Sequence, residues 1–185
     1  MDPMVEILNQ IDDVLHCPRC DLKLSRKNVV VGTGPLEAKI LLIGEAPGRS
    51  EDLKGQPFVG SAGRILNTML EQSGMKREDI YITNVVKCRP PENRVPRQDE
   101  RDACHPYLQK QLEVIKPKLI VLLGKTASET MLGRKVEMGA EHGKVVEHEG
   151  SRFMVTYHPA SVIYNRKLQQ TLEEDFKKIS AFAAD

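Results

Sequence analysis

The segment Lys39–Gly48, with the sequence KILLIGEAPG, constrains the fold of this chain more than any other. Its four apolar residues, Ile40–Ile43, are typical of a strand that is buried on both faces of a parallel sheet. Two glycines and a proline then end the strand in a sharp turn that carries Glu45. Ligands of open α/β sheets bind at this end of the strands. Glu45 is therefore a candidate site residue, although a single glutamate after a strand is more often only solvated.

Length and composition limit the class of protein. The 185 residues predict one domain, residues 1–185, with a substantial core. The formal net charge of +1 gives no general argument for a nucleic-acid partner, so any basic surface must be local. No apolar run is long enough to span a membrane, and the N-terminal segment MDPMVEILNQIDD lacks the apolar core of a signal peptide. We therefore expect an intracellular, cytoplasmic protein.

Apolar periodicity predicts strands that alternate with helices. Strands are expected at 39–43, 80–86 and 119–123, and a hairpin at 144–157. Helices are expected at 4–15, 60–74, 98–115, 125–132 and 169–182, and the segments 49–59 and 88–97 are expected to be loops. This order predicts an α/β domain with a mostly parallel sheet, helices on both faces and right-handed crossovers.

Unusual polar residues follow these strands at one rim of the predicted sheet. Besides Glu45, Asn84 interrupts an apolar strand, His158 follows the last strand, and Phe58 lies in a polar loop. The Asn84 amide offers a donor and an acceptor that match a pyrimidine edge, Phe58 can stack on a flat ligand, and His158 can donate to a developing anion. Each of them also has a simpler interpretation, as a strand cap, a core anchor or a structural histidine. Their convergence on one rim favours a ligand site.

The four cysteines form a second candidate site. Cys17 and Cys20 are a CxxC pair, and Cys88 and Cys104 bracket a proline-rich loop. Cysteines of a reducing compartment are more often metal ligands or free thiols than disulfides. The spacing alone does not choose between a zinc ion and a [4Fe–4S] cluster, and four unligated thiols remain possible. A metal site here would tie the N-terminal helix to the proline loop.

Several motifs together resemble the family 4 uracil-DNA glycosylases, the iron–sulfur members of the uracil-DNA glycosylase superfamily found in bacteria and archaea. The motifs, in chain order with the four cysteines, are GEAPG followed by Glu51–Asp52, then GQPFVGSAG, ITNVVKCRPPENR and YHPAS. The resemblance extends from Cys17 to the last helix. Family 5 enzymes usually lack an acidic residue where Glu45 stands, which favours family 4. The HPAS segment departs slightly from the frequent HPS form.

The resemblance implies a three-layer α/β/α sandwich around a four-stranded, mostly parallel sheet, with a [4Fe–4S] cluster on Cys17, Cys20, Cys88 and Cys104. It implies hydrolysis of the N-glycosidic bond of a deoxyuridine flipped out of DNA, for base-excision repair. The catalytic residues would be Glu45, acting on the water or on the sugar cation, and His158, acting on the uracil anion. Uracil would be bound by Phe58, Asn84, the turn that includes Gly44 and Ala46, and Glu51 near C5.

DNA contacts are expected on the same rim. The candidates are Ser61 and Gly63 at a helix start, the basic residues Lys87, Arg89, Arg94 and Arg97, and a wedge of Val162, Ile163 and Tyr164. Asn93, on the proline loop, is a weaker candidate than Glu51 for the base site. Packing of the last helix explains the wedge residues equally well. We expect a nucleoid-associated monomer that acts on single- or double-stranded uracil-containing DNA. The alternatives are a non-catalytic iron–sulfur or zinc nucleic-acid-binding module, a small redox protein, and a superfamily glycosylase for another deaminated base.

Overall fold

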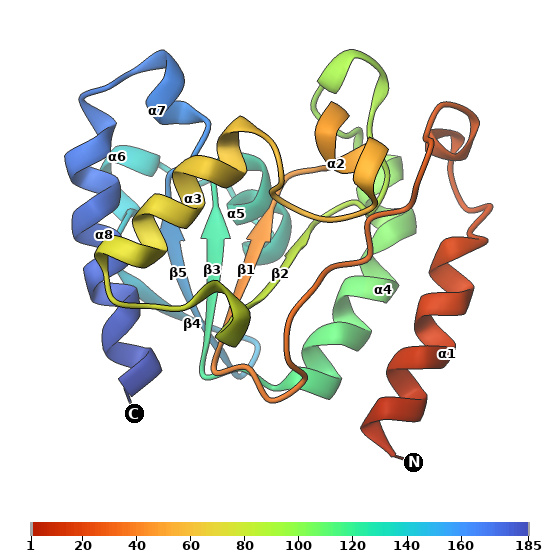
Figure 1. The fold of residues 1–185 in the computed structure, drawn as a ribbon, viewed down its shortest axis with the longest axis horizontal. Helices are drawn as coiled ribbons and strands as arrows, with labels where there is room; N and C mark the ends of the chain where they lie inside the picture. The colour runs from red at the N-terminus through yellow and green to blue at the C-terminus, as the bar shows by residue number, and fades with distance from the viewer. Residues whose placement is uncertain (1, 185) are drawn as a thin grey trace.

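A computed structural model describes residues 2–184, which form a five-stranded sheet with helices on both faces (Figure 1). The strands are β1 (Ile40–Gly44), β2 (Tyr81–Asn84), β3 (Leu119–Leu123), β4 (Val145–His148) and β5 (Ser151–Thr156). They lie in the order β2-β1-β3-β5-β4. All neighbouring pairs are parallel except β4 and β5, which are antiparallel. The α/β prediction is confirmed.

The helices form the two outer layers of the sandwich. Their bounds are α1 (Pro3–Leu15), α2 (Arg49–Lys54), α3 (Ser61–Gln72), α4 (Gln98–Ile115), α5 (Lys125–Leu132), α6 (Met138–Glu141), α7 (Ser161–Tyr164) and α8 (Leu168–Ala184). Three short 3₁₀ segments are η1 (Asp21–Leu24), η2 (Arg77–Asp79) and η3 (Pro91–Asn93). Helices α3 and α8 cover one face of the sheet, α4 and α5 cover the other, and α1 lies on the outside of α4 (Figure 1).

Successive residues of β1 point to opposite faces and so belong to two different cores. Leu41 and Ile43 join the core beneath α4 and α5, whereas Ile40 and Leu42 join the core beneath α3 and α8. All five residues of this strand are buried, which explains why its sequence is apolar without alternation.

Three details of the predicted fold need correction. The sheet has five strands instead of four, because the first arm of the predicted hairpin joins the sheet as the half-exposed edge strand β4. The segment 49–59, predicted to be a loop, contains the helix α2. This helix ends after six residues because Gly55 adopts a left-handed backbone conformation, with φ of +70°. Strand β2 ends at Asn84, two residues earlier than predicted.

The outer edge of β2 is covered by a short piece of the segment that precedes β1. Thr33 pairs with Ile82 in an antiparallel bridge, with N–H···O distances of 2.9 and 2.8 Å. The chain approaches β2 so closely at Gly34 that a Cβ atom there would lie 2.4 Å from the Ile80 carbonyl oxygen. The bridge gives β2 hydrogen-bonding partners on both sides.

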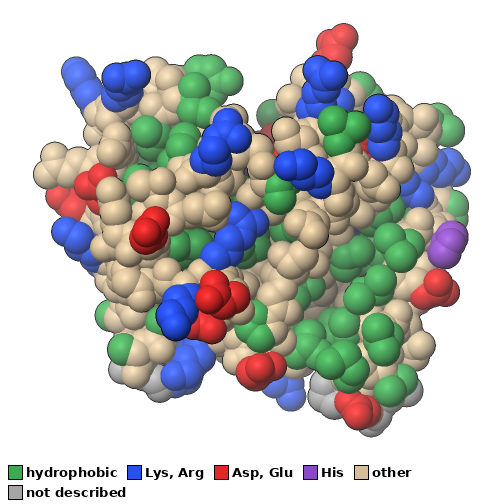
Figure 2. Space-filling view, in the orientation of Figure 1, with side chains coloured by type: hydrophobic (Ala, Val, Ile, Leu, Met, Phe, Trp, Pro, Cys, Tyr) green, Lys and Arg blue, Asp and Glu red, His purple; other side chains and the backbone are tan. Residues whose placement is uncertain are grey.

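The molecular surface is notched above the carboxyl ends of the strands. Figure 2 shows this notch in the upper edge of the molecule, with Lys and Arg side chains on both sides of it. The formal net charge is only +1, so this basic surface is local, as the sequence analysis required. No helix in the described part of the chain is long and apolar enough to cross a membrane.

Candidate active site

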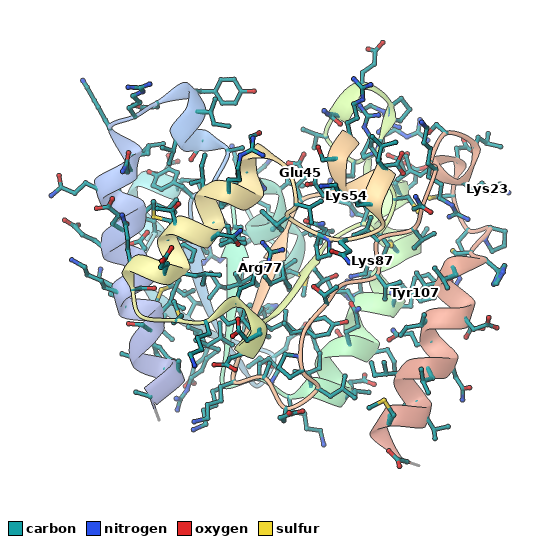
Figure 3. The ribbon with its side chains drawn as sticks, viewed as in Figure 1. Lys23, Glu45, Lys54, Arg77, Lys87 and Tyr107 are labelled. Carbon is teal, nitrogen blue, oxygen red and sulfur yellow. The ribbon has the colours of Figure 1, made fainter. Side chains whose placement is uncertain are left out.

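The ends of three strands bring the predicted pocket residues together around Gly44. A Cβ atom on Gly44 would lie 2.4 Å from Asn84 Oδ1 and 2.7 Å from Cζ of Phe58. Gly44 is the last residue of β1 and pairs with Asn84 in β2, and Glu45 follows it at the upper edge of the sheet (Figure 3). The bare Cα of Gly44 thus borders the site, and any side chain at this position would collide with the groups beside it.

Phe58 supplies a flat apolar wall. Its side chain is buried, and its ring stacks on the imidazole of His158 with 5.4 Å between centroids and 28° between planes. Its φ of +49° is unusual for a residue with a large side chain. The structure therefore holds this aromatic ring in place at some conformational cost.

Asn84 carries an acceptor atom that lacks a donor. The residue is 2% exposed, and Oδ1 has no hydrogen-bond partner among the described residues. Buried polar atoms are nearly always paired, and leaving one unpaired costs about 1–3 kcal/mol. An unpaired acceptor beside an aromatic ring suits a flat ligand that carries an N–H group.

His158 is held as a neutral donor. The backbone N–H of Ala160 donates to Nδ1 at 3.1 Å, which leaves the ring proton on Nε2. Burial lowers the pKa of His158 from 6.5 to about 4, and the nearby Glu51 carboxylate opposes this shift only in part. At neutral pH the ring can therefore donate a hydrogen bond from Nε2 without carrying a charge.

The two glutamates of this region differ in their surroundings. The Glu45 side chain is partly exposed, and none of the described residues is bonded to its carboxylate. Glu51 accepts hydrogen bonds from the backbone N–H groups of Gly48, Val59 and Gly60 at 3.1, 2.9 and 2.7 Å. Glu45 is thus available for chemistry, whereas Glu51 holds the two loops that border the pocket.

The four cysteines line one cavity between α1, η1 and α4. The cavity is also lined by Arg19, Arg26, Lys87, Glu100 and Tyr107. Among the described residues, no group of three Cys, His, Asp or Glu side chains is arranged to hold a single metal ion. The sulfurs surround a space instead of meeting at one point.

Nitrogen donors face three of the sulfurs. Arg26 Nη1 donates to Cys88 Sγ at 3.2 Å, the Lys87 backbone N–H to Cys104 Sγ at 3.3 Å, and the Arg19 backbone N–H to Cys17 Sγ at 3.5 Å. Burial raises the pKa of Cys104 to about 11, and it also raises the pKa values of Cys20 and Cys88. Burial thus favours the neutral thiols, whereas the N–H donors favour the thiolates. A buried thiolate needs a positively charged partner.

The prediction that Lys87 contacts DNA is wrong. Its side chain is 1% exposed and lies in the interior, below Glu45 in the view of Figure 3. Its ammonium donates to Thr83 Oγ1, the Asn84 carbonyl oxygen and Gln111 Oε1 at 2.5, 2.9 and 2.7 Å. Burial lowers the pKa of Lys87 to about 8. Lys87 supports the end of β2 and cannot reach a phosphate group.

The predicted basic loop is held by internal bonds. Arg94 donates from both terminal nitrogens to the fully buried Glu100 carboxylate, at 2.6 and 2.9 Å, and the Arg97 backbone N–H donates to the same carboxylate at 2.7 Å. The Arg94 guanidinium lowers the pKa of Glu100. Arg89 Nε donates to Asn93 Oδ1 at 2.8 Å. The Arg94 guanidinium is therefore engaged in an internal ion pair with Glu100.

The remaining predicted DNA contacts divide between surface and core. Ser61 is exposed, as are Ile163 and Tyr164, at 52% and 89%. Val162 is buried in the core with α8, so the prediction that it enters the DNA stack is wrong. Gly63 is buried as well, and a Cβ atom there would lie 2.0 Å from the Phe58 carbonyl oxygen. Packing against Phe58 thus explains this glycine.

The residues that support the site were not predicted from the sequence. Arg77, Arg26 and the internal role of Lys87 were not anticipated, and all three contact atoms far away in the sequence. Their local sequences look like ordinary charged surface segments. Only the position of Lys87 inside the apolar run that leads to Cys88 hinted at burial.

Comparison with known proteins identifies the class. The family model of the uracil DNA glycosylase superfamily matches residues 31–181. A type-4 uracil-DNA glycosylase of Archaeoglobus fulgidus is 46% identical over 91% of this chain and 89% of its own length. One of Thermotoga maritima is 42% identical over 98% and 95%. A type-5 uracil-DNA glycosylase of Pyrobaculum aerophilum is 31% identical over 94% and 92%.

The chain therefore belongs to the uracil-DNA glycosylase superfamily. Its 42% and 46% identity with type-4 sequences, against 31% with the type-5 sequence, places it in the type-4 group. Glu45, the acidic residue that distinguished the two types in the sequence analysis, lies at the pocket.

Proposed function

We propose that this protein excises uracil from DNA by hydrolysing the N-glycosidic bond of a flipped-out deoxyuridine, for base-excision repair. The unpaired Oδ1 of Asn84 beside the Phe58 ring is the observation that carries the proposal. Uracil has a donor at N3 next to an acceptor at O4. Asn84 accepts from N3–H and donates from Nδ2 to O4, while the base stacks on Phe58. The turn with Gly44 and Ala46 lies along the base edge.

His158 stabilises the leaving group. As the bond between C1′ and N1 breaks, the electron pair stays on the base and negative charge develops on O2. The Nε2–H group of the neutral His158 donates to that oxygen. A donor fixed in a buried site stabilises the anion strongly because it needs no reorganisation.

Glu45 acts on the sugar side of the bond. Positive charge develops on the deoxyribose as uracil leaves, and a carboxylate at the end of β1 stabilises that charge. The same carboxylate orients the water that adds its hydroxyl to C1′, and the remaining proton goes to the uracil anion. Both roles require Glu45 to be ionised.

The four cysteines are proposed to hold a [4Fe–4S] cluster. The donor set fits, because four thiols surround one cavity and N–H groups face three of the sulfurs. The cluster would serve as a structural tether between the N-terminal segment and the proline loop. Arg26 and the Lys87 backbone hold Cys88 and Cys104 in place for it.

DNA would lie across the notched, basic edge of the molecule. Ser61 at the start of α3 and Arg89 on the proline loop are proposed to bind phosphate groups. Ile163 and Tyr164, both exposed at the end of α7, are proposed to fill the gap left by the flipped base. Arg94 shapes the loop through Glu100. We propose that the chain acts as a single-domain monomer.

The test is release of uracil from a defined oligonucleotide. The purified protein is incubated with oligonucleotides that differ only in one uracil or thymine, and abasic sites are detected by alkaline cleavage. An Asn84→Ala variant prepared in parallel controls for a contaminating host glycosylase. Uracil-specific cleavage that is much faster with the wild-type protein than with Asn84→Ala supports the proposal. No uracil-specific cleavage by the wild-type protein contradicts it, and equal cleavage by both preparations contradicts the role of Asn84.

A further inference from the structure

The loop that carries Phe58 has a backbone conformation that needs external support. Phe58 has a φ of +49°, in the left-handed region that non-glycine residues seldom adopt, at a cost on the order of 1 kcal/mol or more. Its carbonyl oxygen points toward the first turn of α3, where a Cβ atom on Gly63 would come within 2.0 Å. The conformation of this loop sets where the aromatic ring lies against Gly44 and His158.

Arg77 supplies that support from outside the pocket. In η2 its guanidinium donates from Nη1 to the Phe58 carbonyl oxygen at 2.8 Å and from Nη2 to the Pro57 carbonyl oxygen at 2.7 Å. Two consecutive carbonyl groups thus accept from the two terminal nitrogens of one planar group, a geometry that lysine cannot reproduce. A third bond joins Nη1 to Asn67 Oδ1 at 2.7 Å.

The other side of the same loop is held by a carboxylate. Glu51 accepts from the N–H groups of Val59 and Gly60, the two residues that follow Phe58. The Arg77 guanidinium therefore binds the carbonyl groups of Pro57 and Phe58, and the Glu51 carboxylate binds the amide groups of the next two residues. Figure 3 shows that Arg77 lies lower on the face of the molecule, away from Glu45 at the upper edge.

We propose that Arg77 is a positioning residue for base stacking, which fixes the Phe58 ring by holding the carbonyl groups of Pro57 and Phe58. This inference rests on the proposed function, because it assigns Phe58 to the uracil base. Arg77 acts only through Phe58, so its loss affects the flipped base and leaves contacts with undamaged DNA intact.

The experiment compares three variants. Arg77→Met keeps the length of the side chain without its donors, Arg77→Lys keeps the charge without the paired donors, and Asn67→Ala removes only the third partner of Arg77. Single-turnover uracil excision should fall about 10–100-fold in Arg77→Met, since displacement of a positioned group by about 1 Å can cost that much. Arg77→Lys should be intermediate and Asn67→Ala close to wild type, and the affinity of all three for undamaged DNA should be unchanged.

A double-mutant cycle with Phe58→Ala separates positioning from general stability. If Arg77 acts through the ring, Arg77→Met should change the excision rate of the Phe58→Ala protein by less than twofold. An equal loss in both backgrounds would overturn the proposal, as would weaker binding of undamaged DNA. If Arg77→Met does not fold, the same cycle is measured with Arg77→Lys. A wild-type protein that releases no uracil would refute the proposed function itself, whereas an active wild type with additive losses refutes only the role of Arg77.

Discussion

The base pocket and the four-cysteine cavity are both buried polar sites beside β2, but they differ in how their polar atoms are paired. In the pocket, Asn84 Oδ1 has no donor among the described residues, and the Nε2–H group of His158 is left to donate. In the cavity, N–H groups face three of the four sulfurs. A site that leaves groups unpaired is prepared for a transient ligand, whereas a site that pairs them is prepared to stay assembled.

This contrast predicts different consequences of substitution. Removing an unpaired group from the pocket should lower activity without lowering stability, because the folded protein loses no bond. Removing a paired group from the cavity should lower stability. Lys87 lies between the two regions, since its backbone binds Cys104 Sγ while its ammonium binds the Asn84 carbonyl oxygen.

The largest effect is expected from His158→Phe. This substitution keeps a ring against Phe58 but removes the Nε2–H donor, so single-turnover uracil excision should fall about 10²–10³-fold, as for other oxyanion donors. His158→Gln, which retains a side-chain N–H group, should lose less. Thermal unfolding measured in parallel should show only a small loss of stability, because the Ala160 N–H loses its acceptor Nδ1 while the ring contact with Phe58 is kept. A loss as large as that of Cys88→Ala would break the contrast.

Asn84→Ala should have the next largest effect. The loss of the base-edge hydrogen bonds, worth about 1–3 kcal/mol, corresponds to a roughly 5–150-fold slower excision. Asn84→Asp should also be slow, because a carboxylate replaces the donor to O4. The melting temperature of Asn84→Ala should equal or exceed that of the wild type. A wild-type excision rate in Asn84→Ala would show that another residue reads the base.

Cys88→Ala, unlike the pocket variants, should lower the stability of the protein. As isolated, the wild-type protein should be brown and contain about four iron atoms per chain, the number held by a [4Fe–4S] cluster. The variant should contain less iron and melt several degrees lower, since each 1 kcal/mol shifts the midpoint of a chain this long by about 2–4 °C. Stoichiometric zinc without iron in anaerobically prepared protein would refute the cluster.

The stability of the fold and the rate of excision should depend little on pH above neutrality, and the effect of His158 on stability should appear at acidic pH. Folding lowers the pKa of His158 from 6.5 to about 4, so between these values the unfolded chain binds a proton that the folded chain does not. The contribution of His158 to stability is therefore complete above pH 6.5 and is lost as the pH falls toward 4. The pH profile of the excision rate should therefore show no inflection from His158 between pH 6.5 and 8. An inflection in this range that is present in the wild type and absent in His158→Gln would contradict a neutral ring.

The smallest effect concerns the salt dependence of DNA binding. Arg89→Ala should reduce the magnitude of the slope of log K against log salt by about one, because one phosphate contact is lost. Lys87→Met should leave the slope unchanged, since the wild-type ammonium is bonded inside the protein. A slope that is reduced in Lys87→Met but not in Arg89→Ala would show that Lys87 contacts DNA.

The strands and the pocket residues were predictable from the sequence, whereas their supports were not. The bounds of β3 and α5 agree with the prediction because continuous apolar runs and helical periodicity are local signals. Glu45, Phe58, Asn84 and His158 were predicted because each is unusual where it stands, and the structure brings the last three together beside Gly44. The hydrogen bonds of Lys87 and Arg77 depend on which acceptor groups the folded chain brings near them. The local sequence around each residue does not indicate those partners. Helix α2 was missed because six residues between glycines carry too little periodicity.

The bridge between Thr33 and Ile82 also protects the strand alignment on which the proposed base recognition by Asn84 depends. Strand β2 is matched to β1 over four residue pairs, the last of which sets Asn84 against Gly44. A slip by one residue would turn the Asn84 side chain to the opposite face of the sheet and bring Thr83 or Val85 beside Gly44. By bonding β2 from its outer side, Thr33 opposes such a slip and occupies the edge that another protein's strand would otherwise pair with.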